Sequence, residues 1–212
     1  MLDSLDDATF MAMNDAAVPV ARVLEGIDAA VAAGFAPLKL NMVVQRGVND
    51  ADILPMARFA REGRHTLRFI EYMDVGNTNG WQLRDVVPAD AILAAVDAAF
   101  PLAPIQEDAT GAVATRWRYL DGAGEIGVIA SVTRPFCAGC TRARLSPEGS
   151  LYTCLFATDG HDLRRLLRDG AEDEVIHRAI AAVWGGRDDR YSDLRSLVTL
   201  DRPKVEMSHI GG

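Results

Sequence analysis

Three cysteines lie close together in the sequence, at Cys137, Cys140 and Cys154, and the chain contains no others. The first two form a Cys-x2-Cys pair, which places both sulfurs on one tight turn, and the third returns from across a short hairpin. Thiolates are soft, anionic ligands that favour zinc or iron–sulfur clusters. Because the number is odd, an open ligand position is one of the arrangements that the sequence allows, and such a position would let the metal take part in chemistry.

The spacing alone is equally consistent with two metal centres. One is a structural zinc site in which His161, seven residues after Cys154, supplies the fourth ligand. The other is a [4Fe–4S] cluster held by three protein thiolates. The other histidines, His65, His177 and His209, lack ligand spacing, and we expect them on the surface.

Two arginines follow the cysteine pair at alternating positions, Arg142 and Arg144. Alternate residues of a strand share one face. Two guanidinium groups on one face can bind a triphosphate through paired charged hydrogen bonds. The alternative is a solvated basic edge strand that binds no ligand.

Two further cations stand in apolar segments earlier in the chain. A lysine such as Lys39 is rarely buried unless it meets an anion, so it is a candidate ligand-binding residue, with an ion pair to Glu71 as the alternative. Arg68 is a second candidate active-site cation, and it too can pair with Glu71. Met73 closes the same segment, at the strand end where parallel barrels carry functional groups, although a core position is the commoner use of such a methionine.

The composition is that of an ordinary folded protein, with 212 residues, 49% apolar and 25% charged. The net charge of −8 excludes a general polyanion binder, so we expect no nucleic-acid partner and a phosphate held only by a few local arginines. No run of about 18 apolar residues predicts a membrane span. The acidic start does not have the pattern of a secretory signal, and the few clustered cysteines favour a reducing cytoplasm.

The first hundred residues alternate between helix and strand patterns. The apolar spacing predicts three helices, over 20–31, 51–62 and 88–100, and two strands, over 37–44 and 67–73. Asp50 is the expected cap of the second helix. Helices between successive strands imply parallel pairing and an α/β fold. Because two parallel strands make neither a barrel nor a covered sheet, we expect further strands before Met1; a complete small α+β fold is the alternative.

The pattern changes after Pro101, where we place a domain boundary. A β-hairpin is predicted around Asp121–Gly124. The cysteine segment carries its own turn between two short strands, and helices are expected around 160–168 and 171–184. The start of the chain and the stretch after Gly185 have loop-like sequences.

The segment Phe136–Phe156 resembles the C-terminal cluster motif of the GTP 3',8-cyclases, radical S-adenosylmethionine enzymes of molybdenum cofactor biosynthesis. Thr141 stands where that family usually has Asn. Lys39–Asp50 and Arg68–Met73 resemble two further segments of the family, and Gly211–Gly212 resembles its diglycine tail. These matches run along the whole chain in the family's order, beginning partway through the family's sequence.

The resemblance implies a fold and a division into two domains. Residues 1–100 would form the C-terminal part of an incomplete TIM-like (α/β) barrel whose N-terminal strands are missing. Residues 101–212 would form a smaller α+β domain that binds GTP and a [4Fe–4S] cluster. The family's Cys-x3-Cys-x2-Cys motif, which binds a second [4Fe–4S] cluster and cleaves S-adenosylmethionine, is absent from this sequence, so we expect the isolated chain to be inactive.

The resemblance also assigns roles to residues. Cys137, Cys140 and Cys154 would bind three irons, and the fourth iron would meet the guanine of GTP. The positions that match nucleotide-binding or cofactor-binding residues of the family are Lys39, Arg68, Met73, Arg142, Ala143 and Arg144. Among them, Lys39, Arg142 and Arg144 are the candidate catalytic residues, and Met73 would border S-adenosylmethionine.

The implied function is the radical S-adenosylmethionine-dependent cyclisation of GTP to 3',8-cyclo-7,8-dihydro-GTP, with this chain carrying the GTP-binding half. The resemblance further implies a homodimer and a functional link to the cyclic pyranopterin monophosphate synthase step. The alternative is a non-catalytic zinc-binding or nucleotide-binding module.

Overall fold

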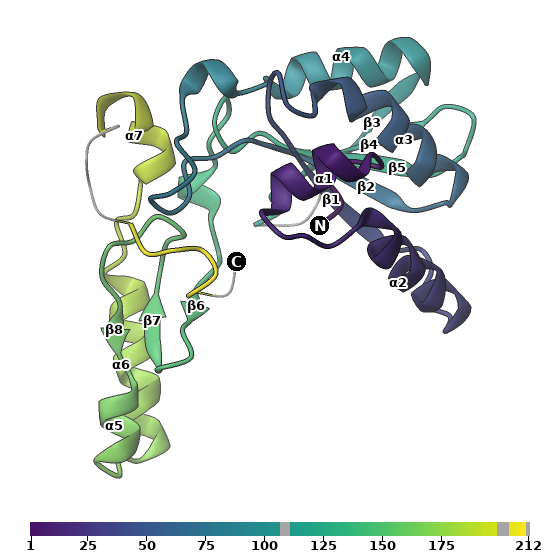
Figure 1. The fold of residues 1–212 in the computed structure, drawn as a ribbon. Helices are drawn as coiled ribbons and strands as arrows, with labels where there is room; N and C mark the ends of the chain where they lie inside the picture. The colour runs from purple at the N-terminus through teal and green to yellow at the C-terminus, as the bar shows by residue number, and fades with distance from the viewer. Residues whose placement is uncertain (107–110, 199–203, 211–212) are drawn as a thin grey trace. The chain divides into compact units, whose positions relative to one another are not determined.

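A computed structural model describes residues 1–106, 111–198 and 204–210 of the chain. It divides into two compact units, the first comprising Met1–Met73 and Trp81–Pro135, the second comprising Asp74–Gly80 and Phe136–Gly212 (Figure 1). The division falls at residue 135, not near the expected boundary at 101. The reason is that strands on both sides of residue 101 belong to one sheet.

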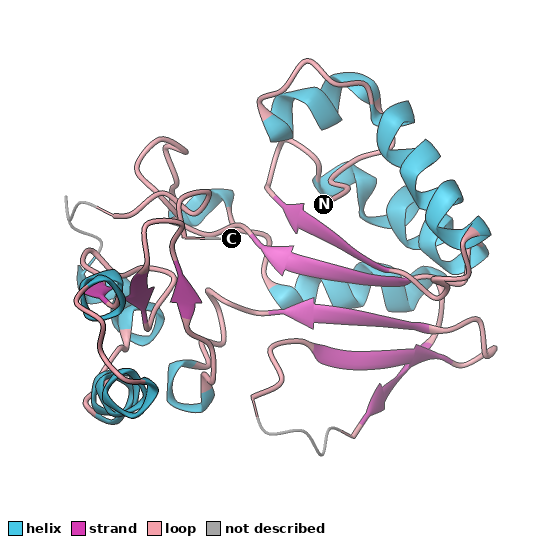
Figure 2. Cartoon of the chain, turned by 90° about the horizontal axis from the view of Figure 1, so that it is seen from below, coloured by secondary structure: helices cyan, strands magenta, loops and turns pink. Residues whose placement is uncertain are grey.

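The sheet of the first unit has five strands in the order β1-β2-β5-β4-β3 (Figure 2). The strands are β1 (Lys39–Val44), β2 (Thr66–Glu71), β3 (Leu102–Ile105), β4 (Thr115–Tyr119) and β5 (Glu125–Ile129). The parallel pairing of β1 with β2 confirms the sequence prediction, and β5 extends that parallel part. The β4–β5 hairpin is antiparallel, as predicted, and β3 pairs antiparallel with β4. The fold is therefore α/β with a mixed sheet.

The helices of the first unit are α1 (Asp7–Asn14), α2 (Val20–Ala32), α3 (Ile53–Glu62) and α4 (Ala89–Ala99), with short 3-10 turns η1 (Asp50–Asp52) and η2 (Leu83–Asp85). Three of them were predicted from apolar spacing. The fourth, α1, replaces the loop expected at the start, because the Asp6 side chain accepts a hydrogen bond from the Thr9 backbone and caps the helix. Within the described residues, no helix is long and apolar enough to cross a membrane.

The core of the first unit follows from the alternation along its strands. In β1, Leu40, Met42 and Val44 are buried, whereas Lys39 is exposed and Asn41 is half-buried. Successive side chains of a strand point to opposite faces, so one face packs into the core and the other carries polar groups. In Figure 2 the strands of the first unit lie in front of the helices of the same unit.

Two local predictions in the first unit are wrong. The Asp50 carboxylate accepts a hydrogen bond from the Gly47 backbone at 2.9 Å and closes the preceding turn, so it does not cap α3. His65, which we expected on the surface, is only 5% exposed. It lies directly before β2, where the chain enters the sheet.

The second unit contains a small antiparallel sheet in the order β6-β7-β8. Its elements are η3 (Cys137–Gly139), β6 (Arg144–Leu145), β7 (Ser150–Tyr152), β8 (His161–Asp162), α5 (Arg164–Arg168), α6 (Asp173–Gly185) and α7 (Tyr191–Val198). The predicted turn between β6 and β7 is present, and Gly149 adopts the positive φ of 86° that it requires. Helix α7 replaces the loop expected after Gly185.

Candidate functional site

The Cys-x2-Cys pair forms the tight turn that its spacing predicts. The turn η3 begins at Cys137, and the Cys140 backbone N–H donates to the Cys137 carbonyl at 3.1 Å. The third cysteine, Cys154, follows β7, and its sulfur accepts a hydrogen bond from the Phe156 backbone N–H at 3.4 Å. All three thiols are free and half-buried.

The three thiols also lie within electrostatic reach of one another. Burial raises the pKa of Cys154, the hydrogen bond from Phe156 lowers it, and the negative charges of Asp189, Cys137 and Cys140 raise it further. A cation bound among these sulfurs would reverse that effect, because a positive charge stabilises thiolates.

The donor atoms at this turn and hairpin are three thiols, and thiolates are the soft, anionic ligands that bind iron–sulfur clusters or zinc. Across the parts of the chain that the structure describes, no group of three or more His, Cys, Asp or Glu side chains is placed to hold a metal ion. His161 therefore does not complete a Cys3His site; it lies in β8 and is exposed. In a [4Fe–4S] cluster each thiolate binds its own iron, so the ligands lie further apart than those of a single ion. The three thiols thus have the chemistry of cluster ligands, while within the described residues they do not form a site for a single metal ion.

Arg142 and Arg144 both lie beside the cysteines, but only Arg144 is on a strand. Arg142 precedes β6, its Nη2 donates to the Cys140 sulfur at 3.0 Å, and its guanidinium lies 5.2 Å from the centre of the Phe136 ring. Its Nη1 is buried without a hydrogen-bond partner. A buried guanidinium nitrogen without an acceptor is costly, which makes it a candidate donor to a bound anion.

Arg144 is half-buried in β6. Burial lowers its pKa, as does the charge of Arg142, while the charges of Cys154 and Cys140 raise it. The two guanidinium groups thus lie close enough to repel each other, and each also interacts with a thiol. Ala143, between them, is exposed and brings only its backbone to the site.

An ion pair that was not predicted from the sequence, Arg187–Asp189, contacts the cysteine turn. Arg187, just after α6, donates from Nη1 to the Cys140 carbonyl at 2.5 Å. Its Nε donates to Asp189 at 3.1 Å. Both residues fall in the polar stretch after Gly185, where neither spacing nor hydropathy distinguishes them from loop residues.

The first unit contains a separate group of candidate residues on the polar face of its sheet. Arg68 lies opposite Asn41 in the register of β1 and β2, and its Nε donates to the Asn41 side-chain oxygen at 2.9 Å. On the other side, Gly127 of β5 lies opposite Arg68, and a Cβ there would lie 3.1 Å from the Arg68 Cγ. The absence of a side chain at Gly127 therefore leaves room for the Arg68 side chain.

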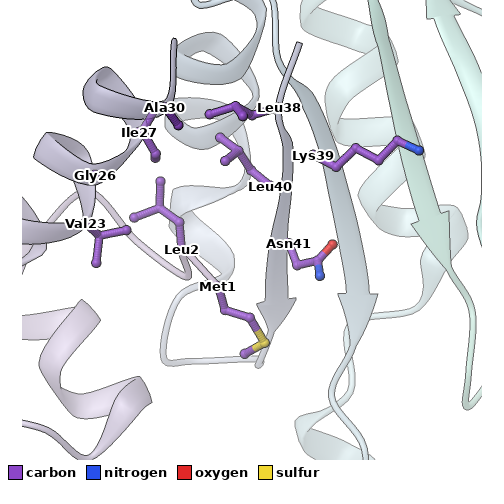
Figure 3. A pocket seen from close by; sticks show the side chains of 10 residues that line it. All are labelled: Met1, Leu2, Val23, Gly26, Ile27, Ala30, Leu38, Lys39, Leu40 and Asn41. Atoms are coloured by element: carbon purple, nitrogen blue, oxygen red, sulfur yellow. The ribbon is translucent and has the colours of Figure 1, made fainter. Parts of the chain in front are cut away.

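Lys39 begins β1 and is exposed, so the expected burial of this lysine is wrong. In Figure 3, Lys39 and Asn41 project to the side of β1 opposite Leu40. The apolar side chains Leu2, Ile27 and Leu40 line a cavity of about 390 Å³ between β1 and α2, with Lys39 and Asn41 at its polar rim.

Glu71 does not pair with Lys39 or Arg68. It is fully buried on the core face, and its carboxylate accepts hydrogen bonds from the backbone of Ala89, Val132 and Thr133 at 2.7–2.8 Å. The carboxylate thus joins the start of α4 to the loop after β5. This explains a buried carboxylate without a cation, because backbone N–H groups satisfy it.

Met73 lies two residues past the end of β2 and is half-buried, at the strand end where the sequence placed it. The candidate residues are thus divided between the two units: Lys39, Arg68 and Met73 belong to the first, and the cysteines with Arg142 and Arg144 to the second. Lys39 lies opposite Thr66 at the start of the parallel strands, whereas Met73 follows the other end of β2, so the structure does not bring these two together. The diglycine Gly211–Gly212 lies outside the described residues.

Comparison with known proteins assigns the chain to a family. The family model described as Molybdenum Cofactor Synthesis C matches residues 65–193. Proteins named GTP 3',8-cyclase match the whole chain, at 48% identity in Acidothermus cellulolyticus, 45% in Xanthomonas campestris and 43% in Staphylococcus saprophyticus. The chain spans 65%, 62% and 63% of these relatives, less than two thirds of their length. The resemblance to GTP 3',8-cyclases is confirmed, and the chain belongs to the Molybdenum Cofactor Synthesis C family.

Proposed function

We propose that the chain is the GTP-binding part of a GTP 3',8-cyclase, the enzyme name that its relatives carry. The observation that carries the proposal is the joint placement of three free thiols and two arginines on one turn and hairpin. The thiols suit a [4Fe–4S] cluster with one iron open to the guanine of GTP. The arginines suit the triphosphate, because guanidinium groups bind phosphate oxygens by charged, paired hydrogen bonds.

The residues of this chain would bind and orient the nucleotide. Cys137, Cys140 and Cys154 would hold the cluster, which when bound supplies a Lewis-acidic iron for the base. Arg142 would donate its unpartnered Nη1 to a phosphate oxygen, and Arg144 would bind the same anionic end. Fixing the base and the triphosphate leaves the ribose little freedom, and such positioning supplies much of the barrier reduction in reactions of this kind.

In the first unit, Lys39 and Arg68 would present positive charge to the nucleotide or to S-adenosylmethionine, with Met73 beside the latter. We propose that the sheet is the C-terminal part of an incomplete barrel, and that further strands of a longer protein pair with β1. Support comes from the parallel β1–β2–β5 order and the apolar cavity beside β1. Parallel strands are normally buried on both faces, which also calls for further cover of this sheet.

The complete reaction would need parts that this sequence does not carry. A second [4Fe–4S] cluster and S-adenosylmethionine, bound by the remaining third of the longer protein, would generate the radical that starts cyclisation of GTP. Cofactor chemistry of this kind belongs to the bound group, and the protein supplies its position. We also propose a cytoplasmic homodimer whose product passes to the cyclic pyranopterin monophosphate synthase step.

Anaerobic reconstitution with iron and sulfide tests the cluster. We expect a brown protein with roughly four irons and four sulfides per chain. A colourless protein that retains one zinc ion per chain would favour the alternative, a non-catalytic zinc-binding or nucleotide-binding module.

The phosphate role of the arginines has its own test. Replacing Arg142 and Arg144 together by Ala should weaken GTP binding at least about 100-fold, because each charged hydrogen bond contributes roughly 1.5–3 kcal/mol and every 1.4 kcal/mol is tenfold in affinity. The exposed Arg168, replaced by Ala, is the matched control and should leave affinity unchanged. Calorimetric titration of GTP measures both. Equal affinity in the double variant and the control would remove these arginines from the phosphate site.

A further inference from the structure

We propose that Arg187 is the positioning residue of the cysteine turn, holding Cys140 in place for the cluster and contributing the positive charge that tunes it. The inference rests on the proposed function, because it concerns the cluster that the turn would hold. It assigns a role to a residue outside the ligand set and outside the two arginines proposed for GTP.

The first observation is that Arg187 is itself held on three sides. Its Nη1 donates to the Cys140 carbonyl at 2.5 Å, and its Nε donates to the Asp189 carboxylate at 3.1 Å. Its guanidinium lies 5.0 Å from the centre of the Trp184 ring, at the end of α6. The side chain is 12% exposed. A planar guanidinium fixed at this many points has little freedom left, so it can act as a rigid support.

The second observation is where this support acts. Cys140 ends the turn that Cys137 begins, and its backbone N–H is already bonded to the Cys137 carbonyl. Arg187 fixes the carbonyl of the same residue, so both polar groups of the Cys140 backbone are held. The direction of its Cβ–Sγ bond then depends on one side-chain torsion. Outer contacts of this kind orient ligands, and their loss typically costs 10–100-fold in metal affinity.

The third observation is the charge distribution around the thiols. Arg187 brings a cation to the Cys140 carbonyl, and the Asp189 carboxylate lies directly beside that cation, 3.1 Å from its Nε. The reduction potential of an iron–sulfur cluster depends on nearby charge and hydrogen bonding. A cation stabilises the more negative, reduced state, and an anion opposes it. Removing Arg187 or Asp189 should therefore shift the potential in opposite directions.

The test uses the reconstituted protein and three variants. In Arg187→Gln, we expect a chelator to remove iron at least about 10-fold faster than from the wild type and the midpoint potential to fall. In Arg187→Lys, which keeps the charge but loses the planar fork, we expect faster iron loss with a potential close to that of the wild type. In Asp189→Asn, we expect the potential to rise.

The matched control is Arg190→Gln. It also replaces a guanidinium group by a neutral amide, but Arg190 forms an exposed ion pair with Asp193. It should change neither iron loss nor potential. Electron paramagnetic resonance at set potentials and iron release to a chelator give readouts that do not depend on catalysis.

The outcomes separate the inference from the function on which it rests. If the wild type takes up no cluster, the proposed function fails. If the wild type holds a cluster and Arg187→Gln matches it in both measurements, the positioning role is wrong. If Arg187→Gln does not fold, the other two variants decide. Iron loss at the wild-type rate in Arg187→Lys, or a potential that does not rise in Asp189→Asn, would overturn the inference.

Discussion

A buried carboxylate in the second unit offers a sharp test of how that unit is held together. The Asp74 side chain accepts hydrogen bonds from Tyr191 at 2.5 Å, Arg195 at 2.8 Å and Lys204 at 2.9 Å. The Asp74 and Arg195 side chains are each only 5% exposed. One carboxylate therefore ties residue 74 to α7 and to the segment that follows it in the sequence.

Replacing Asp74 by Asn keeps the volume and removes the charge. The buried Arg195 and the half-buried Lys204 then lose their counter-charge. Removing one partner of a buried pair typically costs 3–5 kcal/mol. Taking about 3 kcal/mol, because Lys204 retains the Asp74 carbonyl as an acceptor, the unfolding midpoint of a unit of this size should fall by roughly 12–24 °C.

The same carboxylate predicts a pH dependence. Burial by itself raises the pKa of Asp74, but the hydrogen bonds from Tyr191 and Lys204 and the charges of Arg195 and Lys204 hold it below its ordinary value. A lowered folded pKa means that the stabilisation is complete above the unfolded value of about 3.9. It is lost as the pH falls through the folded pKa. Asp74→Asn should remove this part of the acid sensitivity.

Thermal unfolding followed by circular dichroism, at neutral and acidic pH, measures both effects. The control is Asp193→Asn, which breaks an exposed pair with Arg190 and should cost under about 1 kcal/mol. Should Asp74→Asn lose no more stability than this control, or keep the acid response of the wild type, the carboxylate would not be the support that we describe.

Two further predictions concern the first unit. Glu71→Gln removes the charged acceptor of the Ala89 and Val132 backbone N–H groups. Thermal unfolding should therefore show that the free energy of unfolding falls by about 1.5–3 kcal/mol. An unchanged free energy would mean that water satisfies these groups equally well. Gly127→Val should displace the Arg68 side chain and cost about 1–3 kcal/mol through overpacking. An unchanged melting point and an unmoved Arg68 in a crystal structure of that variant would contradict the close approach.

Elements with a strong period could be predicted from the sequence. The type of an element with its own apolar period does not depend on distant contacts. This holds for the helical period of α2, α3 and α4 and for the alternation along β1 and β2. The cysteine hairpin was predictable for the same reason, because its turn residues and ligand spacing are local. The comparisons then confirmed the family resemblance that those motifs carried.

Features that depend on contacts between distant residues could not be predicted. The boundary near residue 101 was misplaced because β5 pairs with β2, about sixty positions earlier, and nothing in its local pattern shows this. Helix α7 was missed because its sequence is polar, and Arg195 is buried only because Asp74 lies against it. Arg187 escaped notice because its side chain contacts the Cys140 carbonyl, a backbone group with no sequence signal.

The central claim is that three thiols of this chain hold a cluster with one iron free of protein ligands. Mössbauer spectroscopy of the protein reconstituted with ⁵⁷Fe, recorded with and without GTP, tests it most directly. The account predicts a [4Fe–4S] spectrum in which one of the four irons is distinct and changes when GTP is added. A protein that binds GTP while its iron spectrum stays unchanged, or that holds no cluster at all, would contradict it.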